Sequence, residues 1–251
     1  MSDLRGSPST RHSPSQNRDL DRLREEYARR KERSADSDLH TLFNPGDLFL
    51  IQQRQRELLA LLRRVGCYPL VGKRILEIGC GSGGVLREFL SYGSTPSLLH
   101  GIELLPWRVT EAKAAAPHLP LINADGRDLP YPDACFDLVM QFTVFSSILN
   151  NDVRREIAGE MRRVLRPSGF ILWYDFWLNP TNPQTRGIRP SEIRTFFPDC
   201  QYLFRKVTLA PPLTRRVASL SWLACYLLER LRIFNTHYLA VIRPQIPQGR
   251  K

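Results

Sequence analysis

The sequence lacks any apolar run of about 20 residues, the length that a helix needs to cross a bilayer. Its first residues are rich in Ser, Arg and Pro and contain no apolar stretch typical of a secretory signal. The cysteines are odd in number and form no Cys-x-x-Cys pair, which argues against a disulfide framework. These absences predict a cytoplasmic protein with reduced thiols and no metal site. The five cysteines are Cys67, Cys80, Cys135, Cys200 and Cys225.

Acidic residues are scarce in the last third of the chain. Residues 181–251 hold 12 basic and three acidic residues, a net charge of +9, whereas the whole chain carries +11. Residues 71–180 are nearly balanced, at −1. This distribution points to an anionic substrate, phosphate groups or a membrane surface near the C-terminal part. A solvated basic face is the alternative.

A glycine cluster follows an apolar, strand-like segment. Residues 75–84 read Ile-Leu-Glu-Ile-Gly-Cys-Gly-Ser-Gly-Gly, and a helical apolar pattern follows. This order predicts strand, glycine turn and helix, the first crossover of a doubly wound α/β sheet. Gly79, Gly81 and Gly83 allow the backbone to approach a ligand closely, and the helix N-terminus offers unpaired N–H groups. Cys80 lies inside this predicted cofactor loop, as filler rather than as a nucleophile.

Acidic residues stand at the ends of successive predicted strands. Glu77 precedes the first glycine by two residues, where a carboxylate suits the ammonium group of an amino acid and repels a pyrophosphate. Glu103, followed by Leu104, ends the second strand and is expected to accept hydrogen bonds from both hydroxyls of a ribose. Asp125, with Gly126, ends the third strand and is expected to accept from an adenine amino group. The set favours S-adenosylmethionine as the cofactor.

A further motif identifies a family. Residues 128–133 read Asp-Leu-Pro-Tyr-Pro-Asp and lead into Phe-Asp-Leu-Val at 136–139. With the glycine loop, this pattern resembles the class I S-adenosylmethionine-dependent methyltransferases over about residues 70–180, most closely their small-molecule branch (the "methyltransferase domain 11" type). The resemblance implies a Rossmann-like seven-stranded doubly wound sheet whose last strand is antiparallel. It also places Gln141 and Phe142, at the end of the fourth strand, beside the transferred methyl group.

We divide the chain into a disordered tail at 1–18, N-terminal helices at 19–70 and a methyltransferase domain at 71–251. One N-terminal helix is predicted at 48–65, with Asp47 as its N-cap and an apolar stripe on one face. The domain alternates strands and helices, which predicts a parallel sheet with right-handed crossovers. The predicted strands are 74–78, 98–102, 120–123, 136–141 and 169–175, then a closing pair at 202–209 and 237–242; the predicted helices between them are 83–92, 106–115 and 151–165.

An apolar insertion, residues 210–236, interrupts the closing pair and has arginines near both of its ends. In the inferred topology both ends lie on the face where ligands bind. We therefore predict a helical cap over the active site, which receives a lipid-like or lipid-linked substrate or touches a membrane surface. A buried cap helix and a dimer interface are the alternatives.

Methyl transfer needs a general base only when the acceptor is a poor nucleophile, because alignment supplies most of the acceleration. Two residues at predicted strand ends are candidates for that base, His237 and Asp175. For each, a structural hydrogen-bonding role is the alternative. Arg186 and Arg189, in the polar segment after the fifth strand, are candidates to bind a phosphate or carboxylate of the acceptor.

The function predicted from the sequence is S-adenosylmethionine-dependent O- or N-methylation of a small-molecule or lipid-linked acceptor, such as a glycan-linked or prenylated precursor, with peripheral membrane contact as an option. An RNA or other nucleic-acid methyltransferase is the runner-up. It is disfavoured because residues 140–143 read Met-Gln-Phe-Thr, not the [DN]-P-P-[YF] element of enzymes that modify base amines. A nicotinamide oxidoreductase and a non-catalytic cofactor-binding scaffold are two further candidates. Gly79, Gly81 and Gly84 fit the dinucleotide fingerprint, but Glu77 argues against it.

Overall fold

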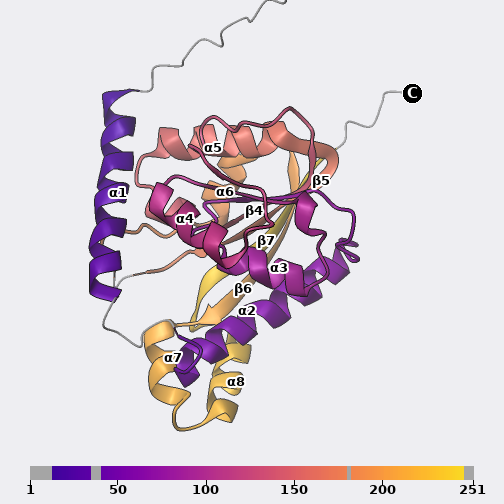
Figure 1. Cartoon of the computed structure of the whole chain (residues 1–251). Helices are drawn as coiled ribbons and strands as arrows, with labels where there is room; N and C mark the ends of the chain where they lie inside the picture. The colour runs from indigo at the N-terminus through magenta and orange to yellow at the C-terminus, as the bar shows by residue number, and fades with distance from the viewer. Residues whose placement is uncertain (1–12, 35–40, 180–181, 246–251) are drawn as a thin grey trace, which may run out of the picture.

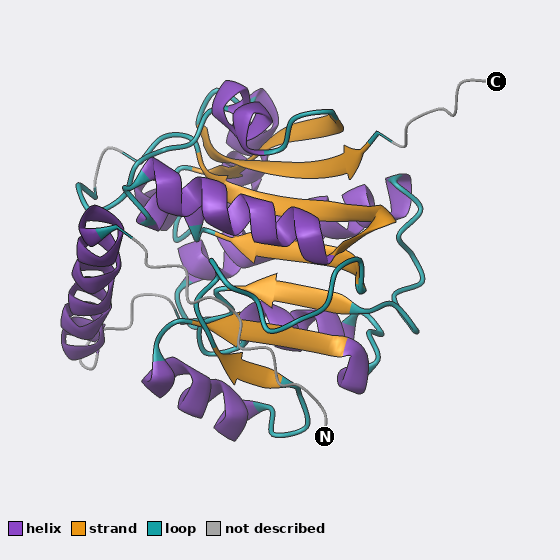
Figure 2. Ribbon diagram, turned by 90° about the horizontal axis from the view of Figure 1, so that it is seen from above, coloured by secondary structure: helices purple, strands orange, loops and turns teal. Residues whose placement is uncertain are grey.

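A single seven-stranded sheet organises the chain, with strand order β3-β2-β1-β4-β5-β7-β6 and helices on both faces (Figures 1 and 2). The computed structural model describes residues 13–34, 41–179 and 182–245. The first five strands run parallel, and β7 lies antiparallel between β5 and β6, which confirms the predicted fold. The strands are β1 (Ile75–Ile78), β2 (Leu99–Glu103), β3 (Leu121–Asn123), β4 (Phe136–Phe142), β5 (Leu165–Phe176), β6 (Cys200–Leu209) and β7 (Asn235–Pro244).

Two layers of helices bury the two faces of the sheet. On one face α2 (Pro45–Arg64), α3 (Gly84–Ser91) and α4 (Pro106–Ala115) share an apolar cluster with the strands. On the other face α5 (Asn151–Val164) and α6 (Pro190–Phe196) pack around Trp173. Short 3₁₀ turns, η1 (Pro96–Leu98) and η2 (Phe145–Ser147), precede β2 and α5. Since parallel strands all end at one edge, the acids predicted at strand ends are brought to the same side.

The helix α1 (Pro14–Ser34) begins before the predicted boundary of the tail at residue 18. Its start is a capping box: the Ser13 amide donates to Gln16 Oε1 at 2.7 Å, and the Gln16 amide faces Ser13 Oγ at 3.4 Å. Pro14 fits the first helical position, where no amide hydrogen is needed. Residues 14–18 are thus helical, and the rest of the predicted tail, residues 1–12, lies outside the described residues.

The N-cap of α2 is Asn44, and the prediction of Asp47 for that position is wrong. Asn44 Oδ1 accepts from the amides of Gly46 at 2.9 Å and Asp47 at 3.3 Å. Asp47 lies within the first helical turn, buried, and forms an ion pair of 2.9 Å with Arg215. This pair ties the start of α2 to the insertion between β6 and β7.

The insertion is mostly helical, as predicted, and forms α7 (Pro211–Val217) and α8 (Trp222–Leu231). It packs against the first half of α2, where the rings of Phe49 and Trp222 meet edge to face at 5.5 Å. Figure 1 shows the two helices beside α2, below the rest of the molecule. No helix in the described part of the chain has the length and apolar character needed to span a membrane.

Candidate active site

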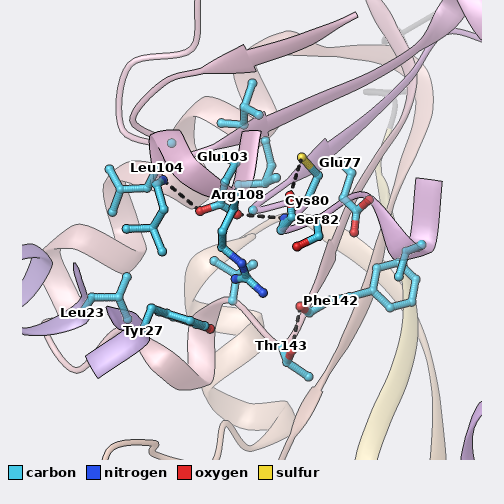
Figure 3. A pocket seen from close by; sticks show the side chains of 18 of the residues that line it. Leu23, Tyr27, Glu77, Cys80, Ser82, Glu103, Leu104, Arg108, Phe142 and Thr143 are labelled. Carbon is cyan, nitrogen blue, oxygen red and sulfur yellow. Dashed lines mark hydrogen bonds between the residues drawn. The ribbon is translucent and has the colours of Figure 1, made fainter. Parts of the chain in front are cut away.

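A cavity of about 390 Å³ lies at the carboxyl ends of β1, β2 and β4 (Figure 3). The loop after β1, the end of β2, the turn after β3 and the end of β4 all contribute to its wall. Its lining includes nine of the predicted cofactor residues: Glu77, Gly79, Cys80, Gly81, Glu103, Leu104, Asp125, Gly126 and Phe142. Of the predicted cofactor residues, Gly83 and Gln141 do not line it.

The glycine loop needs its glycines for two separate reasons. Gly79 and Gly81 have φ angles of +66° and +56°, a left-handed conformation that residues with a Cβ rarely adopt. A Cβ on Gly79 would also lie 2.6 Å from Val144 Cγ2, so the loop packs too closely for any side chain there. Gly83, at φ +76°, is the N-cap of α3 and acts through the backbone at the start of that helix.

Glu77 is a buried carboxylate that faces the cavity. Only 2% of its surface is exposed, and Oε2 has no hydrogen-bond partner among the described residues. Burial raises its pKa well above the ordinary value; nearby Arg54 and Arg108 oppose this rise, whereas neighbouring carboxylates add to it. An unpartnered buried carboxylate oxygen is costly unless a donor reaches it. The site is therefore suited to a ligand that brings an ammonium group.

Glu103 holds the loop after β1 and the turn after β2 together. One carboxylate oxygen accepts from the Gly81 amide at 2.8 Å and the other from the Leu105 amide at 3.0 Å. Each oxygen keeps a second acceptor position, since a carboxylate offers about four lone-pair sites. The side chain is thus fixed in place and still able to accept from two vicinal hydroxyls, as predicted for a ribose.

Asp125 lines the cavity next to an arginine, Arg127, that the sequence pattern did not single out. Its Oδ2 accepts from Arg127 Nη2 at 2.8 Å, and its Oδ1 accepts from the Arg127 amide at 2.9 Å. The arginine side chain is nearly buried and the carboxylate is about one quarter exposed, at 4% and 28%. The pair orients the carboxylate at the turn after β3, on the side of the cavity where the adenine group was predicted.

Gln141 has a supporting position instead of the predicted place in the lining. It is fully buried, and its Oε1 accepts from the Val144 amide at 3.0 Å. Val144 is the residue that presses on Gly79. Gln141 therefore shapes the turn after β4 against the glycine loop. Its neighbour Phe142 does line the cavity, as Figure 3 shows.

His237 and Asp175, the two predicted general bases, do not line the cavity. The ring of His237 stacks on Tyr174 at 4.7 Å and lies 3.8 Å from Phe176, and its Nδ1 is 3.0 Å from Thr236 Oγ1. Asp175 accepts from the backbone amides of Ser146 and Phe176 at 3.1 and 2.8 Å. Both side chains are buried within the sheet layer. Both residues lie near the ends of their strands, but neighbouring rings enclose His237 and backbone amides enclose Asp175.

Burial of His237 predicts an acid-sensitive contribution to stability. Burial, helped by the charge of Arg54, lowers the pKa of His237 from 6.5 to about 3. Below about pH 6.5 the unfolded chain therefore binds a proton that the folded protein does not bind until about pH 3. As the pH is lowered from about 6.5 to about 3, the free energy of unfolding therefore falls by about 1.4 kcal/mol for each pH unit.

The expected result is that His237→Phe removes this part of the acid sensitivity. Between about pH 6.5 and pH 5 the wild type should lose about 2 kcal/mol more than the variant in urea unfolding. Asp175 acts in the opposite sense, since burial raises its pKa to about 6, but it is present in both proteins and cancels from the comparison. Equal slopes for the two proteins would contradict the burial of a neutral histidine.

Part of the lining comes from helices and was not predicted from the sequence. Leu20, Leu23 and Tyr27 reach the cavity from α1, Arg54 from α2 and Arg108 from α4. In Figure 3 Arg108 lies between the strand ends and Tyr27, and its guanidinium is 4.7 Å from the centre of that ring. The sequence of α1 does contain a pattern that predicts a buried face: these three apolar residues are three and four positions apart in an otherwise charged helix. No comparable signal marks the two arginines.

Polar contacts hold α1 against the mouth of the cavity at both of its ends. Asp19 Oδ2 accepts from the amides of Leu149 and Asn150, each at 2.9 Å, and Arg22 Nη2 donates to the Ser147 carbonyl at 2.7 Å. At the opposite end Lys31 lies 3.4 Å from Glu111 of α4. The helix thus closes one side of the cavity.

We expect a chain that starts at residue 41, without α1, to bind S-adenosylhomocysteine at least about tenfold more weakly than the full chain, about 1.4 kcal/mol. The reason is the loss of the apolar wall formed by Leu20, Leu23 and Tyr27. Titration calorimetry measures the difference. A chain that starts at Ser13 keeps the whole helix and is the matched control. Equal affinity of both truncated chains would show that α1 takes no part in the site.

Comparison with known families supports a methyltransferase domain at this position. Residues 75–169 match the family model described as a methyltransferase domain. The chain is 34% identical over 115 residues to phthiotriol/phenolphthiotriol dimycocerosates methyltransferase 1 of Mycobacterium ulcerans, with 45% of this chain and 40% of that protein aligned. It is 33% identical over 106 residues to fatty-acid O-methyltransferase of Mycolicibacterium smegmatis, with 41% and 37% aligned. The alignments thus span about two fifths of these curated relatives.

Solved structures share the fold over more of the chain. A protein from Methanosarcina mazei described as a SAM-dependent methyltransferase has a TM-score of 0.55 and 17% identity, over 73% of this chain and 98% of that one. The [4+2]-cyclase SpnF also has a TM-score of 0.55 and 17% identity, over 77% and 82%. At such identities the likeness shows the fold alone, and the fold carries more than one chemistry.

Proposed function

We propose that this chain is a class I S-adenosylmethionine-dependent methyltransferase that transfers a methyl group from that cofactor to a lipid-like acceptor. The matched methyltransferase domain and the sheet topology support this proposal. The observation that carries the cofactor assignment is the pair of buried carboxylates beside the glycine loop. Glu77 has an unpartnered oxygen for an ammonium group, and Glu103 is fixed by two backbone amides with acceptor positions to spare. A pyrophosphate brings negative charge and no hydrogen-bond donor, so it suits neither acidic side chain.

In this assignment the chain's residues bind, align and exclude water. Glu77 holds the amino-acid part of the cofactor, Glu103 the ribose hydroxyls, and the turn at Asp125 the adenine. The cofactor supplies an electrophilic methyl group on a positively charged sulfur, so the protein's main task is in-line alignment. Helix α1 closes the wall of the cavity and keeps water out.

The lining favours an acceptor that is already nucleophilic. Among the described residues that line the cavity, none is a histidine, whereas Arg54 and Arg108 are both present. A carboxylate oxygen is already unprotonated and reacts without a general base, and arginine binds a carboxylate well. The names of two relatives, one for a fatty acid and one for phthiotriol dimycocerosates, support an acceptor with a long apolar part.

The experiment combines binding with an unbiased search for the product. Calorimetry should detect S-adenosylhomocysteine but not NAD. Incubation of the protein with deuterated-methyl cofactor and cell extracts, followed by mass spectrometry, should place the label in the lipid fraction. NAD binding without S-adenosylhomocysteine binding would overturn the cofactor assignment. Label in RNA would favour the nucleic-acid alternative, and cofactor binding without any labelled product would favour a non-catalytic scaffold.

A further inference from the structure

The outer face of α8 is apolar and exposed. Leu223, Leu227 and Leu231 follow each other at intervals of four residues and are 68%, 57% and 58% exposed. Helical geometry places residues with this spacing in one row. The opposite face of α8 contains buried Cys225, which packs with Phe49 of α2. We call the row of three leucines the leucine ridge.

More apolar residues are exposed just outside the helix. Leu220 precedes α8 and is 87% exposed, and Ile233 and Phe234 follow it at 67% and 41%. Isolated exposed leucines are normal on protein surfaces, but a row with apolar residues at both ends marks an interaction surface. Neither α7 nor α8 lines the cofactor cavity, so the predicted cap is displaced from the methyl-transfer site.

The insertion that carries the ridge is also positively charged. Arg216, Arg230 and Arg232 lie in the insertion, and among the described residues no acidic side chain forms an ion pair with them. A polar cavity of about 410 Å³ lies beside α8, with Arg230, Arg232 and Lys206 in its wall. The acids of that wall already have partners: Glu229 pairs with Arg56 at 2.9 Å and Glu57 with Arg205 at 2.8 Å. An excess of cations is therefore left facing the cavity.

We propose that the leucine ridge and its arginines dock this protein on an anionic lipid surface. The leucines enter the boundary between headgroups and acyl chains, and the arginines and the polar cavity bind lipid phosphates. The charge pattern favours this occupant over a second copy of the chain. A two-fold interface on this face would bring two sets of unpaired arginines together.

The position of α2 relates this surface to the active site. Gln53 lines the polar cavity beside α8, and the next residue, Arg54, lines the cofactor cavity. A single helix therefore separates the lipid surface from the place of methyl transfer. The docking proposal itself does not depend on the proposed function, because vesicle binding requires neither cofactor nor acceptor.

The test is co-sedimentation of the full-length protein with vesicles. We expect binding to equal mixtures of phosphatidylcholine and phosphatidylglycerol, weaker binding to phosphatidylcholine alone, and loss of the difference in high salt. The double variant Leu223→Asp, Leu227→Asp should reduce partitioning by about tenfold or more. Val71→Asp is the matched control, since Val71 is 64% exposed and lies outside the insertion. It should bind vesicles as the wild type does.

A second variant tests the electrostatic part. Arg216→Gln with Arg230→Gln should lower binding to the anionic vesicles and leave the weak binding to phosphatidylcholine unchanged. Thermal melting confirms that each variant is folded. If the wild type fails to bind anionic vesicles, or the leucine variant binds as well as the control, the proposal is overturned. A wild-type dimer that the leucine substitutions dissociate, with no vesicle binding, would assign the face to a subunit interface.

Discussion

Replacement of Glu103 by Ala is expected to weaken binding of S-adenosylhomocysteine by about 2–3 kcal/mol, or roughly a hundredfold. Two effects add. The ligand loses charge-assisted hydrogen bonds, and the amides of Gly81 and Leu105 lose the acceptors that now fix them at 2.8 and 3.0 Å. The link from the loop to the end of β2 is then reduced to the backbone hydrogen bond from the Cys80 amide to the Ile102 carbonyl, at 2.9 Å. Titration calorimetry of the purified variant measures the loss.

Two further substitutions separate the charge from the geometry. Glu103→Gln keeps one acceptor oxygen and should fall between the wild type and Glu103→Ala. Glu25→Ala removes a mostly exposed acid of α1, 70% exposed, and should leave the affinity unchanged. Wild-type affinity of Glu103→Ala would mean that another group binds the ribose, and the cofactor assignment would then depend on Glu77 and the turn at Asp125.

Nine of the predicted cofactor residues lie around one cavity because the signals that predicted them are local. A glycine at positive φ, an acid at a strand end and the strand–turn–helix order are each encoded within about ten residues. Because β1, β2 and β3 are neighbouring parallel strands, Glu77, Glu103 and Asp125 then lie at the same edge of the sheet. The sheet order follows from the same alternation of strands and helices.

The remaining parts depend on contacts between distant segments and were beyond sequence reasoning. His237 was placed correctly on the last strand, but its stacking on Tyr174 arises from the pairing of β5 with β7. The insertion was correctly predicted to be helical, but its contact with Phe49 of α2 could not be inferred from its apolar composition. Arg186, a candidate to bind the acceptor, instead forms an ion pair with Glu192. In each case the sequence pattern predicted the helix or strand, whereas the contacts of the side chain depend on tertiary packing.

Arg154 offers the largest expected effect on stability. The side chain is fully buried; its Nε donates to the Phe145 carbonyl at 3.0 Å and its Nη1 lies 3.2 Å from Glu192 Oε1. Burial lowers its pKa to about 10, and the positive charge of Arg186 adds to this shift, while Glu192 and Asp175 oppose it. The positive charge of Arg154 thus offsets the negative charges of Glu192 and Asp175.

We expect Arg154→Ala to lower the free energy of unfolding by about 3–5 kcal/mol, because the buried carboxyl of Asp175 loses a nearby cation, Glu192 loses a partner, and a cavity forms. Arg155→Ala is the matched control: Arg155 is 64% exposed and its ion pair with Asp152 lies on the surface, so its loss should cost less than about 1 kcal/mol. Urea unfolding of the three proteins gives both numbers. Similar losses for the two variants would mean that water or rearrangement satisfies the carboxylates, and that Arg154 does not hold the turn after β4 in place.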